Sequence, residues 1–584
     1  MPSEDRMNIL RLMKGRHWIL IAVMALFIAA QVWFDLEIPG YMSRITVLLS
    51  DGSPADAIMD EGVAMILCSV GSVLCSFVAG GIAAYVAAQF ANILRREQFR
   101  KVQSYSPEEM SRFDIYSLIT RSTNDVTQVQ LAVARTSQLI VKVPVMVYIA
   151  LTKVATGSME WTAVTAVGIA AIVIVQIFML SYVIPRYRKV QGYTDSMNRT
   201  VREGLSGVRV IRAFNAENYQ NRKADEANDE LTNNNLYALR LMAFTSPFNG
   251  VVQNALTVAI YLLGANLIIA AASPDDALYT FSNMVVYSSY ILYVVSSFIL
   301  LAHIALGLPR AIVCGRRIAE VIDTDITVRG GGREDVPDSD VCLSFRNVSF
   351  AYPGSAGDVL SDISFDVRRG ETVAIVGQTG SGKTSLVNLV PRLFDCTSGK
   401  VEFNGVDVRE YELDTLRSRI GYATQRPVLF SGTVRFNVGY GSDSTDEQIM
   451  DAVRIACIDK YVDGHEGLDT EIQQRGANLS GGQKQRMSIA RAVCKRPDVY
   501  IFDDTFSALD FKTDVEVRRN LAEAVKGSTT LIVSQRIGTV RDVDRIVVIA
   551  DGKVAGQGTH AELLETCEIY REMAEIQGCA EAVR

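Results

Sequence analysis

The stretch ETVAIVGQTGSGKTSLVNLV, residues 371–390, joins a β-branched apolar run, a glycine-rich turn and the start of an apolar helix. It contains the pattern G-x-x-x-x-G-K-T between Gly377 and Thr384. This order of strand, loop and helix is that of a P-loop, in which backbone N–H groups at a helix N-terminus surround phosphate groups. The sequence therefore predicts an α/β domain that binds a nucleoside triphosphate.

The residues of this loop have separate expected roles. Its glycines let the backbone approach the phosphates, Lys383 reaches the β and γ phosphates, and the Thr384 hydroxyl ligates Mg²⁺. The residues expected to bind ATP in and just after the loop are Gly377, Thr379, Gly380, Ser381, Gly382, Lys383, Thr384 and Ser385. A second apolar run, PDVYIFDD at 497–504, ends in two carboxylates and is expected to place Asp503 beside the same Mg²⁺.

A third motif, LSGGQ at 479–483 followed by KQRMSIARAV, resembles the signature of the ATP-binding cassette (ABC) family. Three other strings resemble parts of the same family: VSFAYPG its adenine-stacking loop, GYATQRPVLFSGTVRFNV its Q-loop and TFSALD its D-loop. The resemblance implies that Tyr352 stacks on adenine and that Gln425 occupies a Mg²⁺-sensing position, as a third metal-site residue with Thr384 and Asp503. It also implies that two cassettes close over two ATP molecules, each lying between one chain's P-loop and the other chain's signature. The signature residues here are Ser480, Gly481, Gly482 and Gln483.

Six long apolar stretches lie in the first 310 residues of this 584-residue chain. Five of them contain no Asp, Glu, Lys or Arg: 18–34, 62–90, 161–184, 241–274 and 277–308. The sixth, 137–156, carries only Lys142 and Lys153. A membrane-spanning helix needs about 20 mostly apolar residues, so the sequence predicts an all-α six-helix transmembrane domain at 1–322. A linker at 323–340 then leads to an α/β P-loop cassette at 341–584.

Charged residues in the connections predict the orientation of these spans. The connection between the first two spans is acidic, with Arg44 as its only basic residue. The connections that follow spans 62–90 and 161–184 are instead rich in Lys and Arg. Basic connections stay in the cytosol, so we expect cytosolic termini and a cytosolic cassette on a multi-pass protein of the cell membrane. The long inner connections, 91–136 and 185–240, are expected to continue the spans as helices. Each contains a string that resembles a coupling segment of exporter-type half-transporters.

Lys142 and Lys153 are 11 residues apart, which places them on one face of a helix. They line a cavity for an anionic substrate, or they lie near the two membrane interfaces, with Lys153 on the outer side.

Two positions depart from the family pattern. Active members have glutamate after the aspartate of the second motif, as general base toward water, and histidine at a switch position; this chain has Asp504 and Gln535. A displacement of about 1 Å costs about a hundredfold in rate, and glutamine cannot carry a proton as imidazole does. With these two candidate catalytic residues, the chain therefore resembles the degenerate half of a heterodimeric exporter. A slow but symmetric enzyme is the alternative.

These features predict ATP-driven export of a hydrophobic or amphipathic compound (a drug, lipid or peptide), with ATP and Mg²⁺ as cofactors. The expected partners are a second, non-identical half-transporter, the lipid bilayer and a small-molecule substrate. The net charge of −7 gives no reason to expect nucleic-acid binding. Two alternatives stay open: an importer with the same fold, for example for a siderophore, and a nucleotide-sensing subunit that does not hydrolyse ATP.

Overall fold

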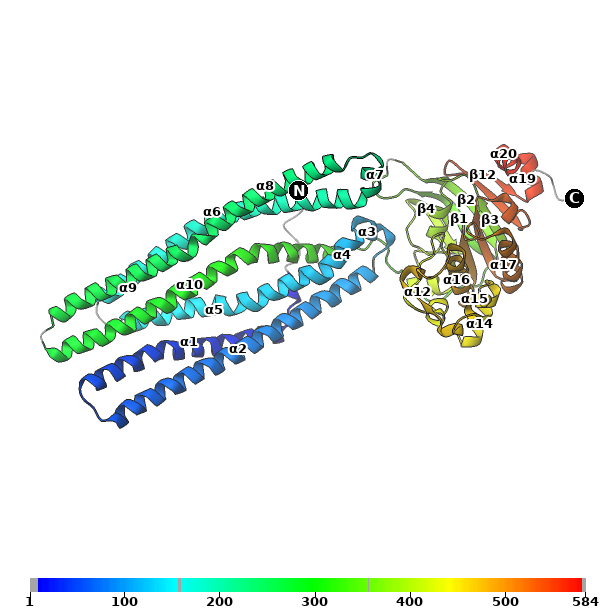
Figure 1. Ribbon diagram of the computed structural model, residues 1–584. Coiled ribbons are helices and arrows are strands. Elements are labelled where there is room, and N and C mark those ends of the chain that lie inside the picture. Colours follow the sequence, from blue (N-terminus) through cyan, green and yellow to red (C-terminus); the bar gives the residue numbers. More distant parts are fainter. Residues whose placement is uncertain (1–8, 156–158, 272, 356, 580–584) are drawn as a thin grey trace. The chain divides into compact units, whose positions relative to one another are not determined.

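The computed structural model describes residues 9–155, 159–271, 273–355 and 357–579 (Figure 1). Their contacts divide the chain into two compact units. The helical unit comprises Met1–Gln103 and Ile115–Thr324, and the α/β unit comprises Ser104–Asp114 and Asp325–Arg584. A helical domain followed by a P-loop α/β domain is the predicted fold class, which is therefore confirmed. The assignment of 104–114 to the α/β unit had no counterpart in the sequence pattern.

Long helices form nearly all of the helical unit. In chain order its elements are η1 (Ile9–Leu12), α1 (Gly15–Ser50), α2 (Ala55–Gln103), α4 (Ile115–Thr120), η2 (Arg121–Asp125), α5 (Val126–Ala155), α6 (Met159–Ser206), α7 (Val208–Ala213), α8 (Glu217–Ala243), α9 (Thr245–Ile269) and α10 (Pro274–Asp323). Figure 1 shows α1 beside α2, α5 beside α10 and α6 beside α8, and these pairs are in contact.

Five of these helices contain stretches long and apolar enough to cross a membrane: Gly15–Ser50, Ala55–Gln103, Ile115–Ala155, Pro247–Ile269 and Pro274–Leu300. The remaining expected span, 161–184, lies within α6, where the apolar stretch Trp161–Val175 is shorter. The spans also continue as helices beyond their apolar parts. At about 1.5 Å per residue, the 49 residues of α2 reach about 74 Å, far more than the roughly 30 Å hydrocarbon core of a bilayer.

Lys153 is paired with an acidic residue of another helix. Its Nζ lies 2.6 Å from Oε1 of Glu37. Because α1 continues to Ser50, Glu37 is on a helix rather than in a loop between spans. The ion pair neutralises the charge of Lys153, which favours a position near the membrane interface over a cavity for an anionic substrate.

The α/β unit is built on two main sheets. Its six-stranded sheet has the order β12-β11-β3-β10-β9-β6, and all its strands are parallel except β12. These strands are β3 (Thr372–Val376), β6 (Ile420–Ala423), β9 (Val499–Asp503), β10 (Thr529–Ser534), β11 (Arg545–Ala550) and β12 (Lys553–Gly558). The antiparallel sheet has the order β2-β1-β4-β5, with β1 (Val341–Phe350), β2 (Leu360–Arg368), β4 (Ser398–Phe403) and β5 (Val406–Asp407). A short pair, β7 (Gly432–Thr433) and β8 (Glu471–Ile472), completes the strands.

Three hydrophobic cores among the described residues hold the helices of this unit, and two of them contain the helices of the P-loop and the signature. The helix after the P-loop, α11 (Lys383–Leu389), buries Leu386 and Val387 in a core shared with both main sheets. The helix after the signature, α16 (Gly481–Cys494), buries Met487 and Ile489 in a second core. The P-loop and the signature thus belong to different parts of the same unit. The other helices are α3 (Pro107–Arg112), α12 (Leu413–Ser418), α13 (Val434–Val438), α14 (Asp446–Ile455), α15 (Asp459–Asp463), η3 (Gly467–Asp469), η4 (Gln474–Gly476), α17 (Phe511–Ala524), α18 (Ile537–Val540), α19 (His560–Thr566) and α20 (Glu568–Ile576).

Candidate functional site

The candidate site lies at the carboxyl ends of four neighbouring parallel strands. These strands are β3, β10, β9 and β6, and the expected site residues come within two positions of their ends: Gly377, Gln535, Asp504 and Gln425. Register pairs Val376 with Ser534 and Asp503 with Val533, so the strand ends are level. Ligands of open parallel sheets bind at this edge, and the sheet thereby gathers motifs that are far apart in the sequence.

The P-loop requires glycine at two of its positions. A Cβ on Gly377 would lie 2.2 Å from the carbonyl oxygen of Ile549, and Gly382 has a φ of +99°, in the left-handed region. Gly382 is also the residue that precedes the first turn of α11. The backbone can therefore adopt the tight path that turns its N–H groups toward one point.

The ammonium group of Lys383 lies within this loop. The side chain is buried, and its Nζ donates hydrogen bonds to the carbonyl oxygens of Gly377 at 2.8 Å and Gln378 at 2.7 Å. Burial lowers the pKa of Lys383 from its ordinary value. A polyphosphate beside it would favour the charged form again. The site thus fits an anionic ligand.

Asp503 and Thr384 form an oxygen-rich corner next to the loop. The Thr384 hydroxyl donates to Oδ1 of Asp503 at 3.0 Å, and Asp503 is 1% exposed. Burial raises the pKa of the Asp503 carboxyl, and a divalent cation would stabilise its ionised form. Hydroxyl and carboxylate oxygens are the ligands that Mg²⁺ prefers, so these two residues fit the expected metal.

The two unusual residues also lie at this edge. Asp504 directly follows β9 with a φ of +49°, and the side-chain amide of Gln425 donates to its Oδ2 at 3.3 Å. The hydroxyl of Thr379 donates to Oε1 of Gln535 at 3.3 Å. Hydrogen bonds therefore connect the P-loop, the acidic pair and the switch position within one chain.

Tyr352 lies beside the start of the helix that follows the P-loop. Its hydroxyl lies 2.9 Å from that of Ser385, and its ring makes edge contacts with Phe350 and Phe394. The aromatic ring is therefore held beside the loop by packing and by one polar contact.

The signature residues form a rigid helix start. Ser480 caps α16: its hydroxyl accepts from the N–H of Gln483 at 3.3 Å, and the Gln483 side chain accepts from the N–H of Ser480 at 2.8 Å. Ser480 and Gly481 are exposed. Among the described residues, the hydrogen bonds of Ser480 and Gln483 stay within this turn, which leaves the exposed helix N-terminus able to meet a ligand carried by a second chain.

Sequence reasoning missed Tyr422, which lies on β6 between the P-loop helix and the acidic pair. Its hydroxyl donates to Oδ1 of Asn388 at 2.8 Å and lies 3.4 Å from Oδ2 of Asp503. Burial, with the nearby Asp503, raises the pKa of Tyr422. The string GYATQ contains this tyrosine, but nothing local to the string indicates a contact with residues 34 and 81 positions away.

Tyr422→Phe is expected to increase about three- to tenfold the Mg²⁺ concentration needed for half-maximal nucleotide binding. A well-formed hydrogen bond to a charged group contributes about 1.5–3 kcal/mol, and the longer 3.4 Å contact with Asp503 should contribute about half as much. Binding of a fluorescent ATP analogue would be titrated with Mg²⁺ in the whole transporter. Tyr440→Phe, at an exposed ring stacked on Phe430, is the control. An unchanged Mg²⁺ titration in Tyr422→Phe would contradict this role.

Comparison with known proteins gives consistent matches over both units. The pattern of the ABC transporter transmembrane region matches residues 20–298, and that of the ABC transporter family matches residues 360–507. An uncharacterized ABC transporter ATP-binding protein of Mycobacterium tuberculosis is 37% identical over 88% of both chains. An ATP-dependent lipid A-core flippase of Syntrophus aciditrophicus is 31% identical over 86% of this chain and 83% of its own length. The structure of a bacterial Atm1-family ABC exporter with ATP bound is similar in fold, with a TM-score of 0.80 at 21% identity over 98% of this chain and 99% of that one.

Proposed function

The chain belongs to the ABC transporter family, as an ATP-hydrolysing multi-pass membrane protein, and on that premise we propose that it exports a hydrophobic or amphipathic compound from the cytosol as one half of a heterodimer. The observation that carries this is one set of spans joined to one P-loop and one signature, which belong to different parts of the α/β unit. A relative named as a lipid A-core flippase favours a lipid-like cargo. Relatives with this name do not support the alternative that the chain is an importer with the same fold.

We propose that this chain's own ATP site is the weaker of two. Asp504 is one methylene shorter than the glutamate of active family members, and the Gln425 amide already holds its Oδ2. Gln535 accepts a hydrogen bond from Thr379 in the P-loop but has no proton-carrying imidazole. The signature, in contrast, has an intact capped helix start. The stronger site would therefore be the one that this signature completes on the partner's P-loop.

In this proposal ATP binds with Mg²⁺ at this edge. Tyr352 lies against adenine, the loop residues and Lys383 hold the phosphates, and Thr384, Asp503 and Gln425 hold the metal. When bound, Mg²⁺ would neutralise charge on the β and γ phosphates. The basic inner connections support a cell-membrane protein with both termini and the α/β unit in the cytosol.

We expect the tagged chain, expressed with its neighbouring genes, to purify with a second and non-identical half-transporter. The pair should move a fluorescent lipid or an amphipathic dye across vesicles in one direction, toward the side opposite the ATP. The partner's site should contain Glu and His where this chain has Asp504 and Gln535. A stable homodimer with full ATPase activity would contradict the heterodimer, and ATP-driven movement only toward the cassette side would contradict export.

A further inference from the structure

The segment that joins the two units, 324–340, is bound along the α/β unit rather than hanging free. The N–H of Gly331 donates to the carbonyl oxygen of Tyr411 at 2.9 Å, and the N–H of Arg333 donates to that of Glu410 at 3.0 Å. A Cβ on Gly331 would lie 2.3 Å from the backbone of Glu410, so the two segments are in close contact. This part of the linker must move with the unit that binds ATP.

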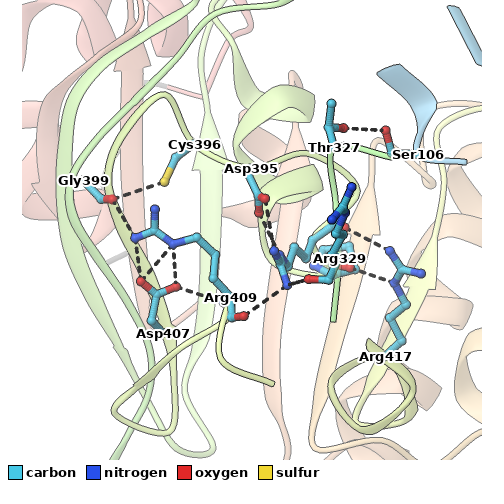
Figure 2. A network of polar contacts seen from close by, with 11 residues as sticks. Ser106, Thr327, Arg329, Asp395, Cys396, Gly399, Asp407, Arg409 and Arg417 are labelled. Atoms are coloured by element: carbon cyan, nitrogen blue, oxygen red, sulfur yellow. Dashed lines mark hydrogen bonds and ion pairs between the residues drawn. The ribbon is translucent and has the colours of Figure 1, made fainter. Parts of the chain in front are cut away.

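A buried arginine connects the same linker to the helix of the P-loop. Arg392 follows α11 and is 5% exposed. Its guanidinium donates to the carbonyl oxygen of Arg329 at 2.7 Å and is paired with Asp395 at 2.8 Å. Figure 2 shows Arg329 within this network, beside Asp395 and Arg409. A displacement of α11 would therefore reach the linker at Arg329.

Two residues before Arg329, the linker is bonded to a segment from a distant part of the chain. Glu109 of α3 is fully buried, and its Oε1 accepts from the N–H of Thr327 at 2.9 Å and from its hydroxyl at 2.6 Å. Its Oε2 accepts from the N–H of Ser106 at 2.7 Å and from its hydroxyl at 2.6 Å. Figure 2 shows Ser106 and Thr327 facing each other at this point. Both carboxylate oxygens are thus used, one for α3 and one for the linker.

Charge makes these contacts strong. Burial alone would raise the pKa of Glu109, but the hydrogen bonds from Ser106 and Thr327 outweigh it and hold the pKa below its ordinary value. Hydrogen bonds to an ionised group are about twice as strong as neutral ones. A buried carboxylate that lost its donors would be costly, so α3 and Thr327 stay together.

The same two stretches of chain are also bonded within the helical unit. Arg121 donates to the carbonyl oxygen of Arg317 at 3.0 Å and is paired with Glu320 at 3.0 Å. Segment 104–125 is therefore bonded at two points to the stretch that contains the end of α10 and the start of the linker. Glu109 bonds to Thr327 in the α/β unit, and Arg121 bonds to Glu320 in the helical unit. Segment 104–114 is continuous with α2, and the linker is continuous with α10, so both long helices end at residues that are joined to this network.

We propose that Glu109 is a positioning residue that transmits the nucleotide state of this chain's P-loop, through Arg392 and the linker, to the inner ends of α2 and α10. Its carboxylate fixes α3 to Thr327, so that α2 and α10 respond together when α11 shifts. The proposal requires ATP binding by this chain, and it is independent of the cargo, the direction of transport and the partner.

Glu109→Gln keeps the size of the side chain but replaces one acceptor oxygen with an N–H donor, which faces donors of Ser106 or Thr327. The matched control is Glu108→Gln, at the neighbouring and partly exposed carboxylate that pairs with Arg112. Backbone hydrogen exchange in the inner ends of α2 and α10 would be measured in the whole transporter, with and without MgATP and vanadate. Binding of an ATP analogue would be measured on the same samples.

We expect Glu109→Gln to bind the analogue within about twofold of the unchanged protein but to lose about half or more of the nucleotide-induced change in exchange. Glu108→Gln should keep the full change. Thr327→Val, which removes the hydroxyl donor to Glu109, should lose part of the nucleotide-induced change in exchange. Thr327→Ser, which keeps a hydroxyl at this position, should keep the full change. If Glu109→Gln does not assemble, the Thr327 pair decides. A full change in Thr327→Val or in Glu109→Gln, or an equal loss in Glu108→Gln, would overturn the proposal, whereas absent ATP binding in the unchanged protein would instead overturn the proposed function.

Discussion

Gly482→Glu is expected to lower the ATP turnover of the assembled transporter by a factor on the order of 10²–10³, the loss seen when a phosphate- or oxyanion-binding group is removed. Gly482 lies in the first turn of α16, where the exposed N–H groups would meet the partner's γ-phosphate. A glutamate there adds bulk and negative charge against the phosphate. Steady-state ATPase assays on the purified complex would measure the effect.

Two companion variants make this result specific. A Cβ on Gly482 would lie 3.4 Å from the carbonyl oxygen of Ala508, an ordinary contact, so Gly482→Ala should fold and separates local packing from charge. Asp504→Asn keeps the shape of the side chain. Because this chain's own ATP site should carry little of the total ATP hydrolysis, we expect this variant to change turnover by about twofold or less. Loss of a working general base would cost about 10²–10⁴. If Asp504→Asn stops turnover as Gly482→Glu does, Asp504 is an active base and the weak-site proposal is wrong.

Lys383→Ala is expected to reduce labelling of this chain by a photoreactive ATP analogue about a hundredfold. Its ammonium is a charge-assisted donor to phosphates in a site of low dielectric, and removing such a charged partner costs about 2–5 kcal/mol. Because Lys383 bonds to the carbonyl oxygens of Gly377 and Gln378 and to the Ser381 hydroxyl, all within its own loop, the fold itself depends little on it. Labelling at a series of analogue concentrations would give the change in affinity.

Lys495→Ala is the control for this variant. Its side chain is partly buried, and its ammonium also donates to two backbone carbonyl oxygens, those of Arg417 and Ile420, but it lies outside the P-loop edge. It should lower the free energy of unfolding as much as Lys383→Ala does and leave labelling nearly unchanged. Equal losses of labelling in the two variants would mean that Lys383 acts on stability and not on phosphate.

Much of the candidate site could be predicted from the sequence because each motif is local. The P-loop, the acidic pair, the Q-loop and the switch position each follow a short apolar strand, and parallel strands bring their carboxyl ends to one edge. The residue types therefore determine which chemical groups each segment contributes, and the parallel sheet determines where those groups lie. The six apolar stretches are local in the same way, since their length alone indicates a membrane span.

Contacts between ordinary residues far apart in the sequence could not be predicted. Tyr422 is 81 positions from Asp503, and Glu109 is 218 positions from Thr327. A tyrosine in a strand and a glutamate near a helix start have many common structural roles, so their type indicates no partner. The ion pair of Lys153 with Glu37 also depended on α1 continuing past its apolar part to Ser50, and the helix-stop signal at Gly52 and Pro54 lies well beyond the apolar run that defined the span.

The close contact at Gly331 also bears on where the α/β unit can be cut from the chain. A fragment that began at the first strand, Val341, would leave the edge at Glu410 and Tyr411 without its backbone partner. It would also remove the carbonyl oxygen of Arg329 from the buried guanidinium of Arg392. An orphaned buried donor costs about 1–3 kcal/mol, more when charged, which is a sizeable share of the roughly 5–15 kcal/mol that keeps a domain folded. A truncation for soluble expression therefore belongs at Asp325, where the α/β unit resumes and before the linker's contacts at Arg329 and Gly331.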